Sequence, residues 1–413
     1  MQQSYNFHLK CEHCGSEYEA NLPINTCLKC GGLLEVIYEN FDTIDGKAAI
    51  KNNKVASMWK YIDLLPHPSD AKNIVSIGEG AGELIFLKKL SESTGLNVYA
   101  RYYGTNPTGT HKDLGMSIAF SMAKEIGITR AITYSTGNAG TSLSAYASRA
   151  GIKAFIISRT TISEEKLINI AALGGNVILI DNLENPWELL SELSKSIGAY
   201  HFTNFLNPYR AEGHKTLAYD IFNTLNDNVC TIYEPLGTGG GIWGTWRGYR
   251  DLIYLGLIAQ MPRIVGVQPE AVKHAVIAFQ EGKESASPYG NSKNTDVLSL
   301  ADSIPLFGDR RPIKAVRESR GNILASTDEE TKEALLTLGR EGLFVEPASA
   351  TALVGLRKEL EEGKIDRHEN VVLSLTGTGL KQPSFVKNEV NRNVIRMSNL
   401  NVEKIKDILQ GGN

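Results

Sequence analysis

The sequence has no long apolar run and no excess of charge of either sign. Of its 413 residues, 42% are hydrophobic, and 43 basic against 46 acidic residues leave a formal charge of −3. No stretch approaches the roughly 18 consecutive apolar residues that span a bilayer. There is no general basic face for nucleic acid, and the N-terminus lacks the features of a secretory signal. We therefore expect no membrane or nucleic-acid partner, a cytoplasmic location, and enough chain for two domains with a small appendage.

Cysteine is also scarce, with five in the chain, and four of these lie in the first 40 residues. They form two Cys-x-x-Cys pairs, each followed by glycine (Gly15, and 31–32), which lets the backbone fold tightly around the sulfurs. This spacing is typical of a four-thiolate zinc site on a short hairpin. Paired disulfides fit a cytoplasmic chain poorly, and a catalytic dithiol needs only one pair.

We expect a zinc-ribbon-like segment over residues 1–40, in which zinc is purely structural because so short a segment cannot build a core of its own. The expected zinc ligands are Cys11, Cys14, Cys27 and Cys30. The fifth cysteine, Cys230, lies in an apolar run and is expected to be a buried core thiol.

From about residue 95, short β-rich runs alternate with runs of helical periodicity. Expected strands cover 98–102, 130–134, 153–157, 176–180, 229–235, 263–267 and 371–375. Expected helices cover 114–126, 139–150, 164–172, 187–197, 242–258, 270–280, 327–341 and 348–361. The alternation predicts right-handed βαβ crossovers and an α/β fold of two lobes with open parallel sheets. The segment 281–302, rich in Ser, Asn and Gly, breaks the rhythm and is expected to be a loop.

The turn 106–111 is followed directly by Lys112, which therefore lies at the start of an expected helix. Backbone N–H groups and the positive end of the helix dipole disfavour an ammonium group there, so we expect a lowered pKa for Lys112, which suits a nucleophilic amine. Taken alone, Lys112 is better interpreted as a solvated lysine in the first turn of a helix, so the functional interpretation depends on the turns described next.

Three further turns each follow an expected strand, which is where open parallel sheets bind ligands. The turn 135–142 offers N–H donors and hydroxyls to an anion such as a carboxylate, and the glycine-rich turn 237–241 lets the backbone wrap a phosphate. The turn 375–381 brings a hydroxyl beside the same crevice. A reactive lysine, a carboxylate site, a phosphate cup and a hydroxyl together predict a pyridoxal 5′-phosphate enzyme.

The motifs resemble the threonine synthase family, within the fold type II, tryptophan-synthase-β-like pyridoxal-phosphate enzymes. The matching segments are Gly78-Glu79-Gly80, Asn106-Pro107-Thr108-Gly109 with Lys112-Asp113, Ser135-Thr136-Gly137-Asn138-Ala139-Gly140, Asn207-Pro208-Tyr209-Arg210, the glycine-rich turn, Val345-Glu346-Pro347-Ala348-Ser349-Ala350 and Thr376-Gly377-Thr378-Gly379-Leu380-Lys381. The resemblance implies the two-lobed fold, a zinc-ribbon-like start and, because dimers are common in the family, a homodimer.

The resemblance also implies roles for individual residues. Lys112 would form the Schiff base and move protons, Asn138 would bind the ring 3′-oxygen, and Thr376 would face the pyridine nitrogen without enforcing a protonated ring. The expected phosphate cup is Gly237, Thr238, Gly239, Gly240 and Gly241. The substrate carboxylate would be bound by Ser135, Thr136, Gly137, Ala139 and Gly140, and an anionic side chain by Asn204 and Arg210.

The family reaction converts the small amino acid O-phospho-L-homoserine and water into L-threonine and phosphate. A related β- or γ-elimination or replacement on another (phospho)hydroxy amino acid is the alternative. A non-catalytic, cofactor-binding regulatory protein with the zinc ribbon as a docking module is the alternative from another class. The expected domains are 41–100 with 190–395, which bind the cofactor, and 101–189, which carries the lysine and the carboxylate turn; 396–413 is expected to be a tail.

The chain departs from the family pattern at three places near these motifs. Leu114 stands where the family usually has arginine, Phe205 where it has serine, and 81–83 replace an aromatic-Thr-Pro sequence, so that Glu83 would repel a phosphate if it faced the site. Other residues near the motifs are expected to be structural. We expect His111 to pack, Trp243 and Trp246 to belong to the core, and His214 and Lys215 to be surface or interlobe contacts.

Overall fold

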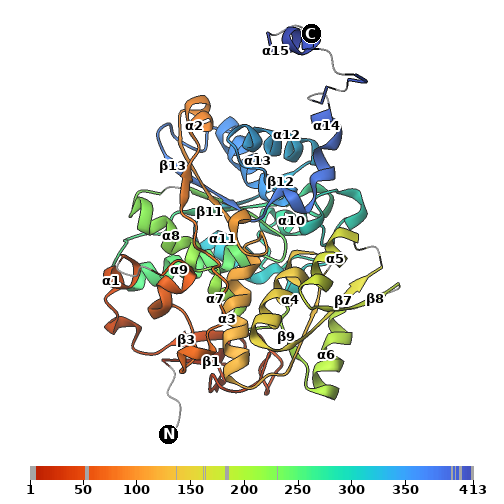
Figure 1. Cartoon of the computed structure of the whole chain (residues 1–413). Coiled ribbons are helices and arrows are strands. Elements are labelled where there is room, and N and C mark those ends of the chain that lie inside the picture. Colours follow the sequence, from red (N-terminus) through yellow and green to blue (C-terminus); the bar gives the residue numbers. More distant parts are fainter. Residues whose placement is uncertain are drawn as a thin grey trace.

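In the computed structural model, two larger sheets and one small sheet organise the described part of the chain (Figure 1). The structure describes residues 6–51, 55–135, 137–160, 162, 164–181, 186–229, 231–391, 394–395, 397–399 and 402–410. In spatial order, the largest sheet contains β12 (Asn322–Ser326), β11 (Arg263–Pro269), β10 (Thr231–Pro235), β13 (Asn370–Leu375), β5 (Asn97–Tyr102) and β4 (Leu84–Phe86). The second sheet contains β8 (Asn176–Ile180), β7 (Lys153–Arg159), β6 (Arg130–Tyr134) and β9 (Tyr200–His201). Its strands are parallel, and in the largest sheet only the edge strand β4 is antiparallel.

All but the last two helices lie between strands in chain order, as βαβ crossovers require. They are α1 (Gly46–Lys51), α2 (Lys88–Thr94), α3 (Lys112–Glu125), α4 (Asn138–Ala150), α5 (Glu164–Ala172), α6 (Pro186–Ile197), α7 (Arg210–Gly213), α8 (Thr216–Leu225), α9 (Gly240–Tyr254), α10 (His274–Gln280), α11 (Arg310–Glu318), α12 (Asp328–Arg340), α13 (Pro347–Glu361), α14 (Lys387–Asn391) and α15 (Val402–Leu409). The α/β fold expected from the sequence is confirmed. Within the described residues, none of these helices combines the length and apolar character needed to cross a membrane.

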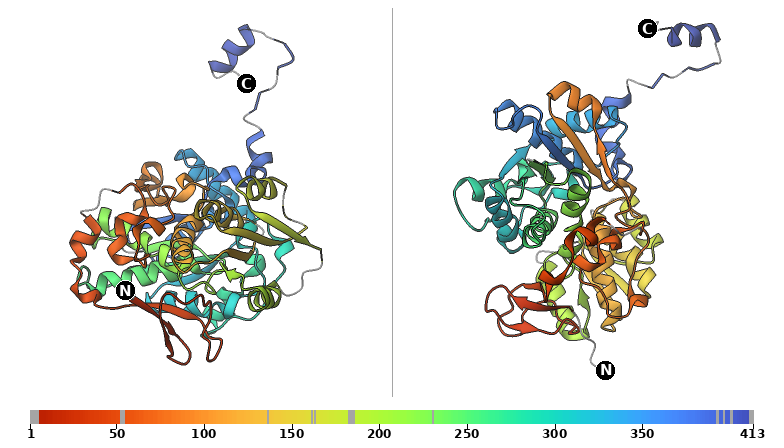
Figure 2. Two further views of the ribbon diagram at one scale, coloured as in Figure 1. Left: turned by 60° about the horizontal axis from the view of Figure 1, so that its bottom comes forward. Right: turned by 90° about the vertical axis from the view of Figure 1, so that its left-hand side faces the viewer.

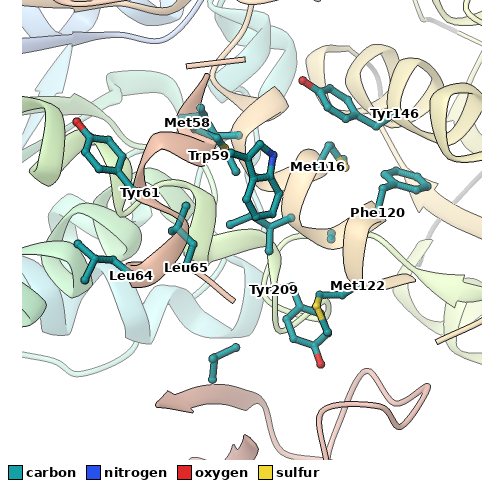
Figure 3. Close-up of a cluster of buried hydrophobic side chains, with 14 of the residues drawn as sticks. Met58, Trp59, Tyr61, Leu64, Leu65, Met116, Phe120, Met122, Tyr146 and Tyr209 are labelled. Atoms are coloured by element: carbon teal, nitrogen blue, oxygen red, sulfur yellow. The ribbon is translucent and has the colours of Figure 1, made fainter. Parts of the chain in front are cut away.

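Helix α3 is buried along almost its whole length, which fixes the residue at its start, Lys112. Figure 3 shows its side chains Met116 and Phe120 within a cluster that also contains Trp59. Phe120 stacks on Phe202, with ring centroids 4.0 Å apart. The indole Nε1 of Trp59 donates to the hydroxyl of Ser117 on α3 at 2.9 Å, so the polar atoms in this cluster are paired as well.

The N-terminal ribbon consists of β1 (Phe7–Cys11), β2 (Glu17–Tyr18) and β3 (Leu34–Tyr38), paired antiparallel in the order β2-β1-β3. It is tied to the rest of the chain by specific hydrogen bonds. Arg247 on α9 donates to the carbonyl of Val36 at 2.7 Å, and the hydroxyl of Tyr38 donates to Glu212 on α7 at 2.8 Å. On another side, Arg311 on α11 pairs with Glu12 at 3.0 Å. The ribbon is therefore part of the folded body.

The C-terminal helix α15 stands away from this body in both views of Figure 2. Its side chains Val402, Ile405 and Leu409 are exposed. The second sheet includes β9, which pairs with β6 and lies beyond residue 189. The division into a cofactor-binding domain, a small domain and a tail stays a prediction.

Candidate active site

The turn that carries Lys112 is fixed against the turn that follows β13. It bends at Gly109, whose φ of 68° is left-handed, and a Cβ there would lie 2.7 Å from Thr378 Cγ2. The N–H of His111 donates to the carbonyl of Thr376 at 2.9 Å, and the N–H of Thr378 donates to the carbonyl of Gly109 at 3.0 Å. The lysine and the expected ring-nitrogen partner therefore come together at the carboxyl edge of the largest sheet, the usual ligand site of such sheets.

Asp113, the second residue of α3, anchors the same turn from inside the protein. It is fully buried and accepts hydrogen bonds from the N–H of Thr108 (2.8 Å), the hydroxyl of Thr108 (2.5 Å) and the hydroxyl of Ser142 (2.6 Å). Burial raises the pKa of this carboxyl, and the three hydrogen bonds oppose that rise. Because Ser142 lies on α4, one carboxyl group links the lysine turn to the helix that follows the expected carboxylate turn.

Lys112 is partly buried, and its pKa is lowered from the usual lysine value to about 8. Burial is the largest cause, followed by the positive charge of Arg210; the negative charges of Glu346 and Asp302 oppose the shift. The direction agrees with the sequence-based expectation. The cause differs, because the expectation rested on the helix N-terminus, whereas burial and a second buried cation account for the shift.

The glycine-rich turn leads from β10 into α9, a helix of 15 residues. Gly239 has a left-handed φ of 77°, and a Cβ on Gly240 would lie 2.6 Å from Asn204 Oδ1, so these positions leave no room for a side chain. The amide of Asn204 donates to the hydroxyl of Thr238 at 2.8 Å. Leu300, from the segment 281–302 that is expected from the sequence to be a loop, packs beside Gly237, where a Cβ would lie 3.2 Å from its Cδ2.

The expected carboxylate turn precedes α4, but part of it is already engaged. The hydroxyl of Ser135 accepts from the N–H of Gly137 at 3.2 Å and from the N–H of Gly140 at 3.0 Å. Ala139 is partly exposed beside them. A Cβ on Gly137 would lie 3.4 Å from Nζ of Lys166 on α5, which brings a cation to the turn. Thr136 lies outside the described residues, as does Cys230, and the binding of a carboxylate here stays a prediction.

Sequence reasoning missed one acidic residue at the centre of the site. Glu346, which precedes α13, is 3% exposed and accepts hydrogen bonds from Asn138 Nδ2 at 2.7 Å and from Thr376 Oγ1 at 3.2 Å. Ser299 Oγ donates to it at 3.4 Å. The segment around Glu346 matched the family motif, yet nothing local in the sequence indicates that its carboxylate meets two other turns.

The two residues expected to bind an anionic side chain lie in different surroundings. Arg210 is 3% exposed, and its Nη1 donates to the carbonyl of Phe202 at 2.6 Å, while its Nε has no hydrogen-bond partner among the described residues. Burial lowers the pKa of Arg210 to about 10. Asn204 is bound to Thr238 instead, so it lies at the phosphate cup.

The structure explains two of the three departures from the family pattern. Leu114 is 1% exposed, and a Cβ on Gly80 would lie 3.1 Å from its Cδ2, so this position is an interior contact of α3. Phe205 has a left-handed φ of 64° and is 1% exposed, and the guanidinium of Arg311 lies 4.9 Å from the centre of its ring. Glu83 is exposed just before the edge strand β4, and it is not among the charges that shift the pKa of Lys112.

Most of the neighbouring residues pack as expected, with one exception. His111 lies 4.8 Å from His214 between ring centres, and Trp243 stacks on Trp246 at 4.6 Å, so His111 and the tryptophans are packing residues. The surface alternative for His214 and Lys215 is wrong, because they are 4% and 0% exposed. Lys215 pairs with Asp251 at 2.6 Å and with Glu212 at 3.3 Å, which the sequence alone could not indicate.

The four N-terminal cysteines form a compact group of sulfur atoms. Their Sγ atoms all lie within 4.8 Å of one another, in the group Cys11, Cys14, Cys27 and Cys30. Gly15 and Gly31 have left-handed φ values of 71° and 72°, as expected for the tight turns after each pair. The sulfurs of a regular four-thiolate zinc site lie about 3.8 Å apart, given a zinc–sulfur bond of about 2.3 Å. The cluster could therefore hold a metal ion.

Comparison with known proteins agrees with this geometry. The family model "Pyridoxal-phosphate dependent enzyme" matches residues 75–377, and the chain belongs to this family. Individual proteins similar to this chain indicate which members of the family it resembles. The chain is 35% identical over 403 residues to the threonine synthase of Methanocaldococcus jannaschii, covering 94% of this chain and 98% of that protein. It is 34% identical over 385 residues to that of Methanosarcina acetivorans, covering 92% and 93%.

These relatives confirm the resemblance to threonine synthases that the motifs indicated. Solved structures show the same fold at lower identity. Maize serine racemase matches with a TM-score of 0.62 and 18% identity over 75% of this chain and 92% of that chain. The processed threonine deaminase isoform 2 of Solanum lycopersicum matches with a TM-score of 0.61 and 21% identity over 79% and 82%. The protein is a pyridoxal-phosphate-dependent lyase that catalyses elimination or replacement on a small-molecule substrate.

Proposed function

We propose that the protein converts O-phospho-L-homoserine and water into L-threonine and phosphate. The observation that carries the proposal is Arg210. This buried cation lies near enough to Lys112 to lower the pKa of its amine, and its Nε has no hydrogen-bond partner among the described residues. A buried guanidinium without an acidic partner favours an anionic ligand. A phosphate on the substrate side chain supplies one, and the relatives named threonine synthase support the same reaction.

The residues at the site fit pyridoxal 5′-phosphate in chemistry and arrangement. Lys112 offers an amine with a pKa of about 8, and the start of α9 at Gly240 offers backbone N–H groups that a helix leaves free for a phosphate. Asn138 and Thr376 offer an amide and a hydroxyl, and they share one acceptor, Glu346. When bound, the cofactor supplies an electron sink for the carbanions that the reaction requires.

The chain itself binds, orients and moves protons. Arg210 holds the phosphate and, by keeping it hydrogen-bonded, stabilises it as a leaving group. Lys112, with a pKa of about 8, can take a proton from one substrate carbon and return it to another near neutral pH. The N–H groups of the turn before α4 and the ammonium of Lys166 orient the substrate carboxylate.

A second candidate is elimination or replacement on another (phospho)hydroxy amino acid. It is favoured by Phe205, which occupies the position of a family serine with a buried side chain that carries no hydroxyl. The regulatory alternative without catalysis has little support, since Lys112 is present and placed at the sheet edge.

We also propose that zinc occupies the cysteine cluster, that the chain forms a homodimer in the cytoplasm, and that the domains divide as expected. Tyr18 and Ser16 support a metal-bound form, because their hydroxyls lie 3.1 Å from Cys27 Sγ and 3.2 Å from Cys14 Sγ and can donate to thiolates.

The test is to incubate the full chain, loaded with cofactor, with O-phospho-L-homoserine and to measure phosphate and threonine together. Equal amounts of both products are expected. If neither product forms while another hydroxy amino acid is consumed, the second candidate holds instead.

Arg210→Met tests the phosphate role within the same assay. We expect kcat/KM for the phosphorylated substrate to fall by about 100-fold or more, because a charge-assisted contact to phosphate is lost. Binding of unphosphorylated L-homoserine, followed by the visible absorbance of the cofactor, should change by less than about three-fold. Arg250→Met removes an exposed arginine from α9 and serves as a control for the loss of a positive charge elsewhere on the chain, with kcat/KM near that of the wild type.

A further inference from the structure

Glu346 joins three parts of the chain that are far apart in sequence. Its Oε2 accepts from Asn138 Nδ2 at 2.7 Å and from Ser299 Oγ at 3.4 Å, and its Oε1 accepts from Thr376 Oγ1 at 3.2 Å. Asn138 is the first residue of α4, which follows β6 of the second sheet, whereas Thr376 follows β13 of the largest sheet. One carboxylate therefore links the ligand-binding turns of both sheets.

The surroundings make this carboxylate costly unless its hydrogen bonds form. Glu346 is 3% exposed and takes part in none of the ion pairs between described residues. Its charge acts at longer range on three cations, raising the pKa of Lys112, Lys166 and Lys381 against the effect of burial. A buried carboxylate that loses a hydrogen bond is destabilised. The three donor side chains are therefore restrained in the orientations that keep these bonds.

The bond to Asn138 decides which way its amide faces. A carboxylate can only accept, so the NH₂ group of Asn138, and not its carbonyl oxygen, lies toward Glu346. One of the two N–H bonds is used there. The other is left for an acceptor such as a ring oxygen.

The bond to Thr376 uses the single proton of its hydroxyl. Once Thr376 Oγ1 donates to Glu346, that oxygen can only accept from further partners, so in this orientation it would hydrogen-bond a ring nitrogen only if that nitrogen carries a proton. Ser349 Oγ, at 3.1 Å, can donate to it, and the N–H of Gly377 donates to Ser349 Oγ at 2.9 Å, so the network is consistent in its donors.

We propose that Glu346 is a positioning residue that holds Asn138 and Thr376 in the orientations required to bind the cofactor ring. The inference rests on the proposed function only in taking these two residues as ring contacts. Glu346 contacts both residues, one from a turn of each larger sheet, and its charge also raises the pKa of the Lys112 amine.

The test compares Glu346→Gln with Glu359→Gln in the full chain. Glu359 lies on α13, the helix that follows Glu346, is fully buried and pairs with Arg263 at 2.8 Å, so it matches Glu346 in burial but not in position. The dissociation constant of pyridoxal phosphate is measured by titrating the cofactor-free protein and following the visible band. Glu346→Gln should weaken binding by about ten-fold and shift the band, because glutamine cannot accept from both donors. Glu359→Gln should leave the dissociation constant within about two-fold of the wild-type value and the visible band unshifted, even where it lowers the unfolding temperature.

Non-additivity separates positioning from a general structural effect. The double variant Asn138→Ala, Thr376→Val lacks the two side chains through which Glu346 acts. Adding Glu346→Gln to this double variant should weaken its cofactor binding by less than about two-fold. A ten-fold loss in both backgrounds, or cofactor binding by Glu346→Gln equal to that of the wild type, would overturn the proposal. No substrate is present in these titrations. Failure of the threonine assay therefore bears on the proposed reaction, and failure here bears on Glu346.

Discussion

At the level of single residues, the chemistry of the site depends on how buried charges act on Lys112. A pKa of about 8 leaves about a tenth of the amine neutral at pH 7, whereas an unperturbed lysine is neutral there in less than about one molecule per thousand. Arg210 increases the neutral fraction and Glu346 decreases it. The site thus holds a lysine that is reactive near neutral pH, with one cation (Arg210) lowering its pKa and two anions (Glu346 and Asp302) raising it.

This balance can be measured as the rate at which the cofactor-free protein takes up pyridoxal phosphate between pH 6 and 10. Only the neutral amine attacks, so the rate should rise with a midpoint near pH 8. Arg210→Met removes a positive charge and should raise the midpoint, whereas Glu346→Gln removes a negative charge and should lower it, each by about one pH unit. Lys112→Ala should give no visible band. A wild-type midpoint near pH 10 would contradict the lowered pKa.

Sequence patterns predicted the turns at the site better than the contacts between them. Lys112, Asn138 and Thr376 lie in short motifs whose turn residues and following helices can be recognised locally. Glu346 meets Asn138 across 208 residues of sequence, and an acidic residue before a proline is an ordinary start for a helix. Which turns come into contact depends on sheet order, which no local pattern contains.

At the level of elements, close contact between α3 and α7 determines where the lysine helix lies. A Cβ on Gly115 would lie 2.4 Å from the carbonyl oxygen of Arg210, and one on Gly213 would lie 2.3 Å from that of Leu114. The two backbones therefore touch with no side chain between them. This contact brings Arg210 close to Lys112, and the carbonyl groups concerned belong to rigid helical turns.

Gly115→Ala should therefore destabilise the protein and weaken its cofactor binding together. We expect a loss of about 2–4 kcal/mol in the free energy of unfolding, because backbone atoms must shift to admit the methyl group. Gly339, on α12, has nothing within 4 Å of an added Cβ, so Gly339→Ala should instead stabilise by about 0.5–1 kcal/mol. Denaturant unfolding measures both variants. Equal stability of the two would show that the α3–α7 contact can adjust.

Two of the elements that the sequence analysis did not predict are the strand β12 and the helix α11. Strand β12 is only five residues long and begins and ends with Asn322 and Ser326. Helix α11 is only nine residues long, contains Pro312 near its start, and has more charged residues than apolar ones, although its apolar residues do lie on one face. Both are fixed by packing: Ile323 of β12 and Ile313 of α11 lie in one buried cluster.

At the level of the whole molecule, the N-terminal ribbon and the catalytic body are joined by buried polar contacts. Tyr38 of the ribbon donates to Glu212, which pairs with the fully buried Lys215. Glu212 lies on α7 next to the contact with α3. A structural change in the N-terminal ribbon can therefore displace α3, the helix that begins at Lys112, through its contacts with α7.

Removal of the metal tests this connection. Treatment with a strong chelator, or Cys11→Ser, should lower the unfolding temperature by about 5 °C or more, because the four sulfurs would lose the proposed zinc ion and with it the link between the two Cys-x-x-Cys turns. Added zinc should restore the chelated protein but not the variant. If the metal-free protein unfolds at the same temperature, the ribbon does not depend on a metal. Cofactor uptake measured in parallel shows whether the effect reaches Lys112.

Removal of the C-terminal segment after residue 395 tests the opposite end of the molecule. Among the described residues of α15, Lys406 bonds to Glu403 within the helix, and Val402, Ile405 and Leu409 are exposed on one side. Because this helix stands away from the body (Figure 2), we expect its loss to change the unfolding temperature by less than about 2 °C and to leave cofactor binding intact. Light scattering of both forms should give the mass of a dimer, since the proposed homodimer would be formed by the body. A fall from dimer to monomer on truncation would instead assign the exposed apolar side of α15 to the contact between subunits.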